Sequence, residues 1–146
     1  MKIFIGSDHA GFELKEKLIP YLKNLGYEVE DKGAFSLDPS DDYPDFVKPV
    51  AEEVSKDPEA KGIVIGGSGE GEAIATDRFP NVRTAVWYGG NLEPLKLSRE
   101  HNDANILSLG ARMMSEGEAL EAVKLWLETP FSGDERHVRR IEKIDE

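Results

Sequence analysis

The sequence predicts one α/β domain over residues 1–146, with a five-stranded parallel sheet doubly wound into a Rossmann-like or flavodoxin-like three-layer sandwich. Three observations carry this prediction. Short apolar runs that end in glycine or serine are typical of parallel strands covered on both faces. These runs alternate with helical patterns five times, which indicates strand–helix units in one sheet. Each unit takes roughly 30 residues, so five strands in an open sheet fit better than an eight-stranded barrel.

The predicted strands are separated by helices along the whole chain. We expect strands at residues 2–6, 27–31, 62–66, 83–87 and 106–109. Apolar residues at three- and four-residue spacings from Phe12 to Leu25 predict the first helix, and Gly26 stops it. A polar, turn-rich loop at 35–42 precedes a second helix that begins near Pro44. The third and fourth helices are expected at about 72–77 and 92–100.

The last two helices are predicted from a capping box and from an apolar face. Ser115 followed by Glu118 forms a capping box at the start of the fifth helix, which ends before Pro130. Residues 131–146 are expected to form a C-terminal tail with one short helix. The face expected to dock this helix on the domain consists of Val138, Ile141 and Ile144.

Composition and charge exclude several classes of function. The chain has 18 basic and 29 acidic residues, a net charge of −11, which argues against sequence-independent binding to nucleic acid or to an anionic membrane surface. It has no cysteine, so disulfides, thiolate metal ligands and thiol nucleophiles are excluded. No stretch approaches the roughly 18 apolar residues of a membrane span, and no signal peptide precedes the first strand. We therefore expect a cytoplasmic protein without nucleic-acid or membrane partners.

Three loops are candidates for a binding site, because ligands of doubly wound sheets bind beyond the carboxyl ends of the strands. These loops are 7–9 (Ser-Asp-His), 66–72 (Gly-Gly-Ser-Gly-Glu-Gly-Glu) and 110–112 (Gly-Ala-Arg). Successive amides in a glycine loop at a helix N-terminus attract an anion. The loop at 66–72 matches neither a dinucleotide fingerprint, because Glu72 stands where the last glycine should be, nor a P-loop, because the chain contains no Gly-Lys pair. It is expected to bind a small anion or a charge that develops in a reaction; the alternative is a flexible glycine turn.

Glu72 would lie beside these loop amides. A carboxylate there could abstract a proton while the amides hold the resulting oxyanion. The helix terminus favours its charged form and burial disfavours it, and the sequence does not decide between the two. The alternative is a first-turn glutamate that only complements the helix dipole.

The chain has three histidines: His9, His101 and His137. None lies in a metal-binding spacing with another histidine, so no dedicated metal site is expected. His101 is the most suggestive, because it lies in a polar run before a buried strand. The alternative for each is a structural histidine.

The tail contains the one basic cluster of the chain, Arg136-His137-Val138-Arg139-Arg140. Arg136 and Arg140 are four residues apart and share a helix face, so with His137 they could clamp a phosphate. The alternative is a solvated helix whose arginines pair with Glu135 and Glu142.

Six motifs together carry a resemblance to a known family. They are Gly6-Ser7-Asp8-His9-Ala10-Gly11, Asp42-Tyr43-Pro44, the glycine loop 66–72, Arg99-Glu100-His101-Asn102, Gly110-Ala111-Arg112 and the basic cluster 136–140. In this order, and over nearly the whole chain, they resemble the type B ribose-5-phosphate isomerases, in the wider group that includes galactose-6-phosphate and allose-6-phosphate isomerases.

The resemblance implies aldose–ketose isomerisation through a cis-enediolate, without metal or cofactor. Many members use a cysteine directly after the third strand as the base, and Gly66 stands at that place here. In this respect the chain is similar to the cysteine-independent branch, in which a glutamate at the end of the glycine loop is the base; that glutamate matches Glu72. His101 would donate the proton that opens the furanose ring.

The resemblance also implies the substrate-binding groups. Asp8 and His9 would contact the sugar, and Tyr43 would line the pocket. The oxygens of the enediolate would be held by the side chain of Asn102 and by the amides of Gly67, Ser68, Gly69, Glu70 and Gly71. The phosphate would be bound by Arg112, Arg136 and Arg140, with His137 as a helper. Sites of this family lie between two subunits, so a homodimer or a dimer of dimers is implied.

Two alternatives remain at this stage. One is isomerisation of another sugar phosphate, a tetrose or a hexose 6-phosphate. The other is a sugar-phosphate or nucleotide-binding module without catalysis, against which the retention of Glu72, His101 and the arginines argues. Glu70 departs from the family pattern, and because its charge would repel an anionic intermediate, we expect its side chain to point to solvent.

Overall fold

The computed structural model describes all 146 residues and contains one sheet of five parallel strands. The strands are β1 (Lys2–Ser7), β2 (Glu28–Asp31), β3 (Lys61–Gly66), β4 (Thr84–Trp87) and β5 (Ile106–Gly110). Each end lies within one residue of its predicted position. The predicted fold class is confirmed.

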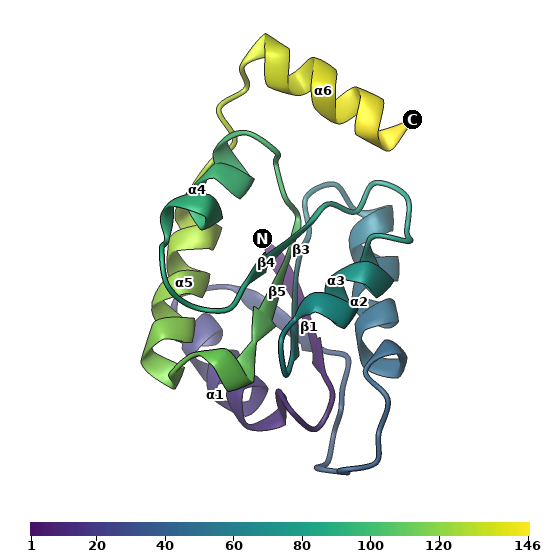
Figure 1. Cartoon of the computed structure of the whole chain (residues 1–146), viewed down its shortest axis with the longest axis vertical. Coiled ribbons are helices and arrows are strands. Elements are labelled where there is room, and N and C mark those ends of the chain that lie inside the picture. The colour runs from purple at the N-terminus through teal and green to yellow at the C-terminus, as the bar shows by residue number, and fades with distance from the viewer.

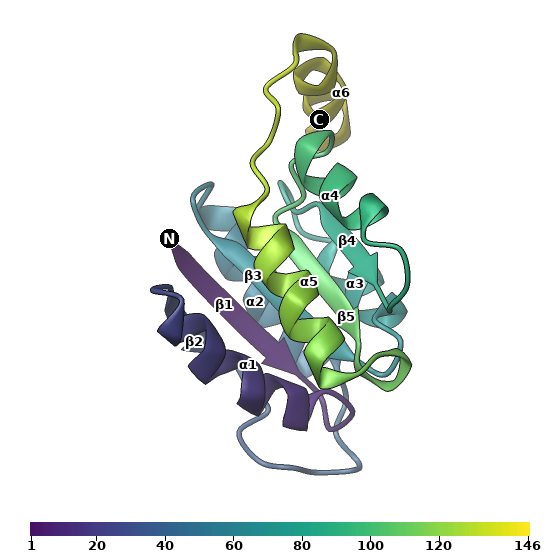
Figure 2. The same ribbon diagram turned by 90° about the vertical axis from the view of Figure 1, so that its left-hand side faces the viewer.

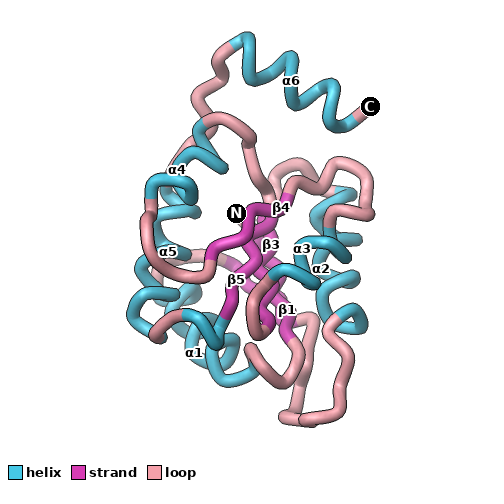
Figure 3. The backbone as a smooth tube through the Cα atoms, viewed as in Figure 1, coloured by secondary structure: helices cyan, strands magenta, loops and turns pink.

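The helices form two layers around the sheet. They are α1 (Phe12–Asn24), α2 (Pro44–Lys56), α3 (Glu70–Thr76), α4 (Glu93–Glu100), α5 (Glu116–Glu128) and α6 (Glu135–Asp145), with a 3₁₀ turn at Ala111–Met113. Helices α1, α4 and α5 cover one face, and α2 and α3 cover the other (Figure 1). Each layer has its own buried core, built around Trp126 on the first face and around Val50 on the second. The strands lie between these layers, with loops at both ends of the sheet (Figure 3).

The order of the strands is β2-β1-β3-β5-β4, which differs from the flavodoxin-like order because β5 is inserted between β3 and β4. Burial accounts for this order. All five residues of β5 are buried, as an inner strand requires, whereas Thr84, Ala85 and Val86 of β4 are only partly buried. The chain turns to opposite sides after β1 and after β3, so the carboxyl ends of these two strands form the switch point of the sheet.

The helix starts agree with the sequence in one case and are shifted in another. The capping box of α5 is present: Ser115 Oγ accepts from the Glu118 amide (3.1 Å) and Glu118 Oε1 accepts from the Ser115 amide (2.9 Å). Helix α3 begins at Glu70, two residues earlier than expected. No helix has both the length and the apolar content needed to cross a membrane.

The tail forms the expected helix, but two of the three residues of the predicted docking face stay exposed, and Ile141 is only partly buried. Val138 is 37% exposed and Ile144 is 61% exposed. Helix α6 instead contacts the domain through His137, which stacks on His101 at 4.3 Å, and through an ion pair of 2.8 Å between Asp145 and Arg83. The helix lies beyond the amino ends of the strands, where polar groups are its available partners, and stands off the domain in both ribbon views (Figures 1 and 2).

Candidate active site

A cavity of about 390 Å³ opens at the carboxyl ends of β1 and β3. It brings together eight of the predicted site residues: Asp8, His9, Tyr43, Gly67, Ser68, Gly71, Glu72 and Arg112. The loops that supply them follow β1, β3 and β5, as the switch-point argument predicts, while Tyr43 precedes α2.

The glycine loop is held rigidly against β5. Gly69 has φ +86°, which favours glycine, and its carbonyl accepts a hydrogen bond of 2.7 Å from Ser108 Oγ. A Cβ at Gly71 would lie 2.6 Å from the hydroxyl oxygen of Tyr43. A flexible glycine turn would show neither feature, so the packing argues against that alternative.

Glu72 is only 4% exposed although it lies in the first turn of a helix. Burial raises the pKa of Glu72, backbone hydrogen bonds at Glu72 and Gly69 lower it, and the charges of Asp8 and Glu70 raise it further; the net direction is upward. Burial therefore outweighs the helix terminus, which answers the question that the sequence left open. A carboxyl group with a raised pKa is better matched to proton transfer at neutral pH than an ordinary one.

The Glu72 carboxylate occupies the space above Gly66. A Cβ added at residue 66 would overlap Oε1 and Cδ of Glu72. The carboxylate therefore fills the position that a side chain directly after β3 would take, and any side chain at residue 66 competes with it.

Arg112 lies along the glycine loop. Its amide donates to the Gly67 carbonyl (3.1 Å), and a Cβ at Gly67 would lie 3.3 Å from Arg112 Nη1. Its side chain is exposed and has no ion-pair partner in this chain, so it is free to bind an anion in the cavity. Glu70 is exposed, as predicted.

The sequence missed one residue of this site, Asp41. Its Oδ1 lies 2.7 Å from His9 Nδ1 and accepts from the His9 amide at 3.0 Å. Asp8, His9 and Asp41 are the one group whose side-chain atoms converge closely enough, within 4.8 Å, to offer ligands to a metal ion. The 2.7 Å contact itself has the length of a charge-assisted hydrogen bond. Asp41 and His9 are 32 residues apart, so no local motif could have joined them.

The remaining predicted residues are not brought to this cavity within one chain. His101 and Asn102 precede β5, whereas Glu72 follows β3, and these two parallel strands pair from Gly62–Ile106 to Gly66–Gly110. The two groups therefore lie at opposite ends of strands about 16 Å long. The residues that lie at the far end are His101, Asn102, Arg136, His137 and Arg140.

This second group has its own organisation. His137 is buried and stacks on His101, and burial, followed by the charges of His101 and Arg136, lowers the pKa of His137. Glu135 pairs with Arg139 at 3.4 Å, which leaves Arg136 and Arg140 exposed and without an ion-pair partner. The solvated-helix alternative accounts for Arg139 but not for these two arginines.

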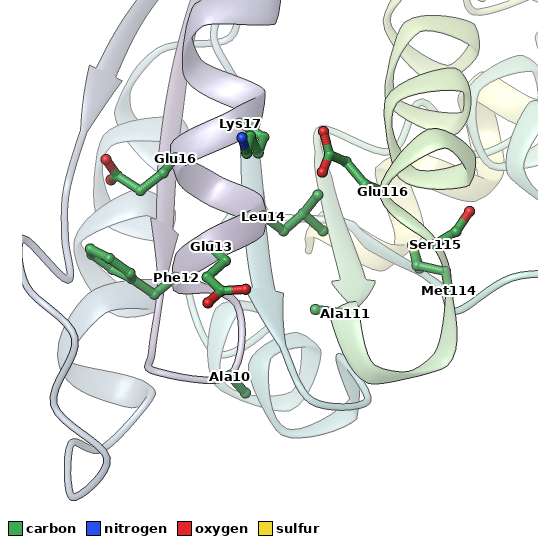
Figure 4. Close-up of a pocket in the computed structure, with 10 residues that line it drawn as sticks. All are labelled: Ala10, Phe12, Glu13, Leu14, Glu16, Lys17, Ala111, Met114, Ser115 and Glu116. Carbon is green, nitrogen blue, oxygen red and sulfur yellow. The ribbon is translucent and has the colours of Figure 1, made fainter.

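A second cavity, of about 350 Å³, lies between the first turns of α1 and α5 (Figure 4). Three glutamates line it, Glu13, Glu16 and Glu116, against a single cation, Lys17. This excess of negative charge repels a phosphorylated substrate. The Glu72 cavity has the unpaired Arg112 and the amides of the glycine loop at the carboxyl ends of the strands, and we take it as the candidate active site.

Comparisons with known proteins identify the family of the chain. The family model described as Ribose/Galactose Isomerase matches residues 3–144. Ribose-5-phosphate isomerase B of Mycolicibacterium paratuberculosis is 44% identical over 146 residues, which cover 100% of this chain and 91% of that protein. The Escherichia coli K12 enzyme of the same name is 39% identical, with 98% of this chain and 93% of that protein covered.

Solved structures of relatives have the same fold. The Clostridium thermocellum ribose-5-phosphate isomerase B superposes with a TM-score of 0.92 at 47% identity, with 99% of this chain and 95% of that chain covered. The Mycoplasma genitalium enzyme, solved with bound ribulose-5-phosphate, superposes with a TM-score of 0.93 at 38% identity, covering 98% and 93%. With a family model spanning almost every residue and relatives at these identities, the chain belongs to the ribose/galactose isomerase family.

Proposed function

We propose that the chain interconverts ribose 5-phosphate and ribulose 5-phosphate. The observation that carries this proposal is the buried Glu72 carboxylate, whose pKa is raised and which lies beside a rigid loop of amides at the switch point of the sheet. The names of the relatives and the ribulose-5-phosphate bound to the Mycoplasma genitalium enzyme support the choice of substrate.

The chemistry requires one base that reaches two carbons. Ionised Glu72 takes the proton from C2 of the open aldose, and the electron pair moves to the C1 oxygen to form a cis-enediolate. The hydroxyl proton on the C2 oxygen moves to the C1 oxygen, the same carboxyl group returns its proton to C1, and the C2 oxygen becomes the carbonyl of the ketose. Loop amides from Gly67 to Gly71 stabilise the enediolate oxygens without reorganisation. We therefore propose that the chain belongs to the cysteine-independent branch of the family, with Glu72 as its base.

We further propose that two copies of the chain complete each site as a homodimer. The Glu72 cavity and the group around His101 lie at opposite ends of one chain, so a two-fold pair placing one end against the other would assemble two complete sites. In that pair, His101 of one copy donates the ring-opening proton, and Asn102, Arg136 and Arg140 of the same copy bind the substrate beside Glu72 of the other.

Two features of the tail support this pairing. Val138 and Ile144 leave an apolar stripe uncovered on α6. A groove of about 750 Å³ lies between the tail and β4, and both Asn102 and Ile144 line it. A second chain would cover this stripe. Its Glu72 cavity would then lie next to Asn102 of the first chain.

Mixing two defective variants tests the shared site. Glu72→Gln and His101→Asn homodimers are each expected to be nearly inactive. Co-expressed chains form hybrids in half of the dimers, and each hybrid has one intact site out of two, so about a quarter of wild-type activity should return. A mixture that stays as inactive as its parents would mean that one chain holds the whole site.

The arginines of α6 are expected to control substrate binding. Arg136→Ala and Arg140→Ala should each raise KM about tenfold, because each removes a charge-assisted contact to the phosphate. The increase should be larger at low ionic strength, where the attraction is less screened. Arg139→Ala is the matched control, since it lies on the same helix but pairs with Glu135, and it should leave KM unchanged. Unchanged kinetics in both test variants would remove the tail from the site.

The raised pKa of Glu72 predicts the acid limb of the pH profile. The base must be ionised, so kcat should fall as the pH drops through this raised pKa, which lies above the ordinary value of 4.5. We choose kcat because the phosphate of the free substrate itself titrates near about pH 6 and affects kcat/KM. A limb at or below 4.5 would contradict the burial argument.

Substrate choice is tested by rates across phosphorylated tetroses, pentoses and hexoses, with the pentose expected to be fastest. A non-catalytic binding module would bind the sugar phosphate without exchanging the C2 proton in deuterated water. The cytoplasmic location stays a prediction.

A further inference from the structure

The loop between β2 and α2 places one carboxylate behind His9, which lines the candidate site. Residues 35–40 of this loop are exposed, yet the side chain of Asp41 is only 7% exposed. The loop holds its own shape, because the Asp41 amide donates to the Asp38 carbonyl (3.1 Å) and Asp38 Oδ1 accepts from the Ser40 amide (3.0 Å). A turn that is otherwise surrounded by solvent therefore presents a buried acid.

Asp41 makes two hydrogen bonds to a single partner, His9. Its Oδ1 lies 2.7 Å from the ring nitrogen Nδ1 and 3.0 Å from the main-chain amide of the same residue. An ionised carboxylate can only accept, so Nδ1 must carry the proton. The two bonds restrain both the backbone and the ring of His9.

These bonds determine which ring nitrogen is left for a ligand. With Nδ1 donating to Asp41, Nε2 is the free nitrogen of His9, and His9 lines the cavity beside Glu72 and Arg112. When Nε2 contacts a substrate, the hydrogen bond from Nδ1 to Asp41 holds the ring in place. An orienting group of this kind acts through the residue that it holds.

We propose that Asp41 is a positioning residue: it holds His9 as the Nδ1-protonated tautomer with Nε2 available to the sugar phosphate. Asp8, whose Oδ2 is 3.9 Å from the same nitrogen, is the weaker partner, since that distance exceeds a hydrogen bond. Asp8 Oδ1 instead accepts from the Ala10 amide (3.0 Å) and fixes the turn after β1.

The first test needs no substrate and therefore does not depend on the proposed function. Nitrogen-15 NMR of the imidazoles at about pH 8.5, well above the ordinary histidine pKa of about 6.5, reports the tautomer of each ring. The chain has only three histidines, so His9→Gln assigns the signal by its disappearance. The wild-type chain should show His9 protonated on Nδ1, and Asp41→Ala should shift it toward the Nε2-protonated form that free imidazole side chains prefer. An Nε2-protonated His9 in the wild type, or an unchanged ring in Asp41→Ala, would overturn the proposal.

The second test rests on the proposed function and asks whether the orientation matters for the reaction. Asp41→Ala should lower kcat/KM for ribose 5-phosphate roughly tenfold. In a His9→Ala background the same change should have an effect of less than about twofold, because the group that Asp41 orients is gone. Equal effects in both backgrounds would show that Asp41 acts by another route and would overturn the proposal.

Two further variants keep the tests specific. Asp38→Asn removes a charge from the same loop while keeping its turn, and should change neither the tautomer nor the rate. Asp41→Asn keeps an acceptor of the same shape and serves if the alanine variant does not fold: it should preserve the tautomer but move the Nδ1-bound proton upfield as the hydrogen bond weakens. A wild-type chain with no isomerase activity would contradict the proposed function. The NMR test of the His9 tautomer does not depend on that activity and would still decide the role of Asp41.

Discussion

Glu72→Gln is expected to lower kcat about 10³-fold while the fold is retained, because a positioned general base contributes 10²–10⁴ to such a step. Glutamine keeps the shape of the side chain but cannot accept the C2 proton. The measurement is turnover of ribose 5-phosphate, together with loss of deuterium exchange at C2. Glu93→Gln is the matched control, since Glu93 is also a first-turn glutamate but is exposed, and it should leave turnover unchanged. Near-normal turnover in a folded Glu72→Gln variant would show that the base is elsewhere.

The same variant should be more stable than the wild type at pH 8. Because folding raises the pKa of Glu72, the native chain binds more protons than the unfolded chain between 4.5 and the raised value. Wild-type stability therefore falls as the pH rises through that window, and the full penalty of a buried charge remains above it. Glutamine lacks this penalty. The Glu72→Gln variant should therefore have a higher Tm than the wild type at pH 8, and the difference should vanish near pH 4. A lower Tm at pH 8 would contradict this reading of the burial.

Gly66→Ala is expected to lower kcat/KM about hundredfold, because the added methyl group takes the space of the Glu72 carboxylate and moves the base away from the reacting carbons. The overlap is with the end of a flexible side chain, so the fold should be retained. Circular dichroism and kinetics measured on the same sample separate a loss of activity from a loss of the fold.

Gly117→Ala is the matched control for this substitution. A Cβ at Gly117 meets no atom within 4 Å, and the residue lies in α5. The change should leave the kinetics unaltered and raise the free energy of unfolding by about 0.5–1 kcal/mol, as alanine does in a helix. Wild-type kinetics in Gly66→Ala would mean that the carboxylate does not act from the position above residue 66.

Local patterns predicted most of the fold, and together with the family resemblance they named eight residues that line the candidate cavity. Apolar runs located the strands to within one residue, because parallel strands buried on both faces leave few alternatives for such sequences. The position of β5 inside the sheet could not be predicted, since strand order depends on the packing of whole helix layers. Asp41 was missed for a similar reason: its partner is 32 residues away, and the 35–42 loop contains other acids that remain exposed.

The tail shows a different limit of sequence reasoning. The apolar pattern of α6 predicts that the helix docks on its own domain, but Val138 and Ile144 stay exposed in the single chain. Amphipathic patterning predicts that a surface will be covered without saying which molecule covers it. His137 of α6 stacks on His101 at the end of α4. The sequence alone does not show that these two helices lie next to each other.

The order of the strands has a consequence for motion. The loops carrying Asp8, Glu72 and Arg112 follow β1, β3 and β5, the three strands that have a neighbour on both sides, whereas β2 and β4 form the two edges. Amide hydrogen exchange should therefore be fastest in the edge strands, which can open locally at low free energy. Such opening leaves the three inner strands paired, so the chain can fray at both edges while Asp8, Glu72 and Arg112 keep their relative positions.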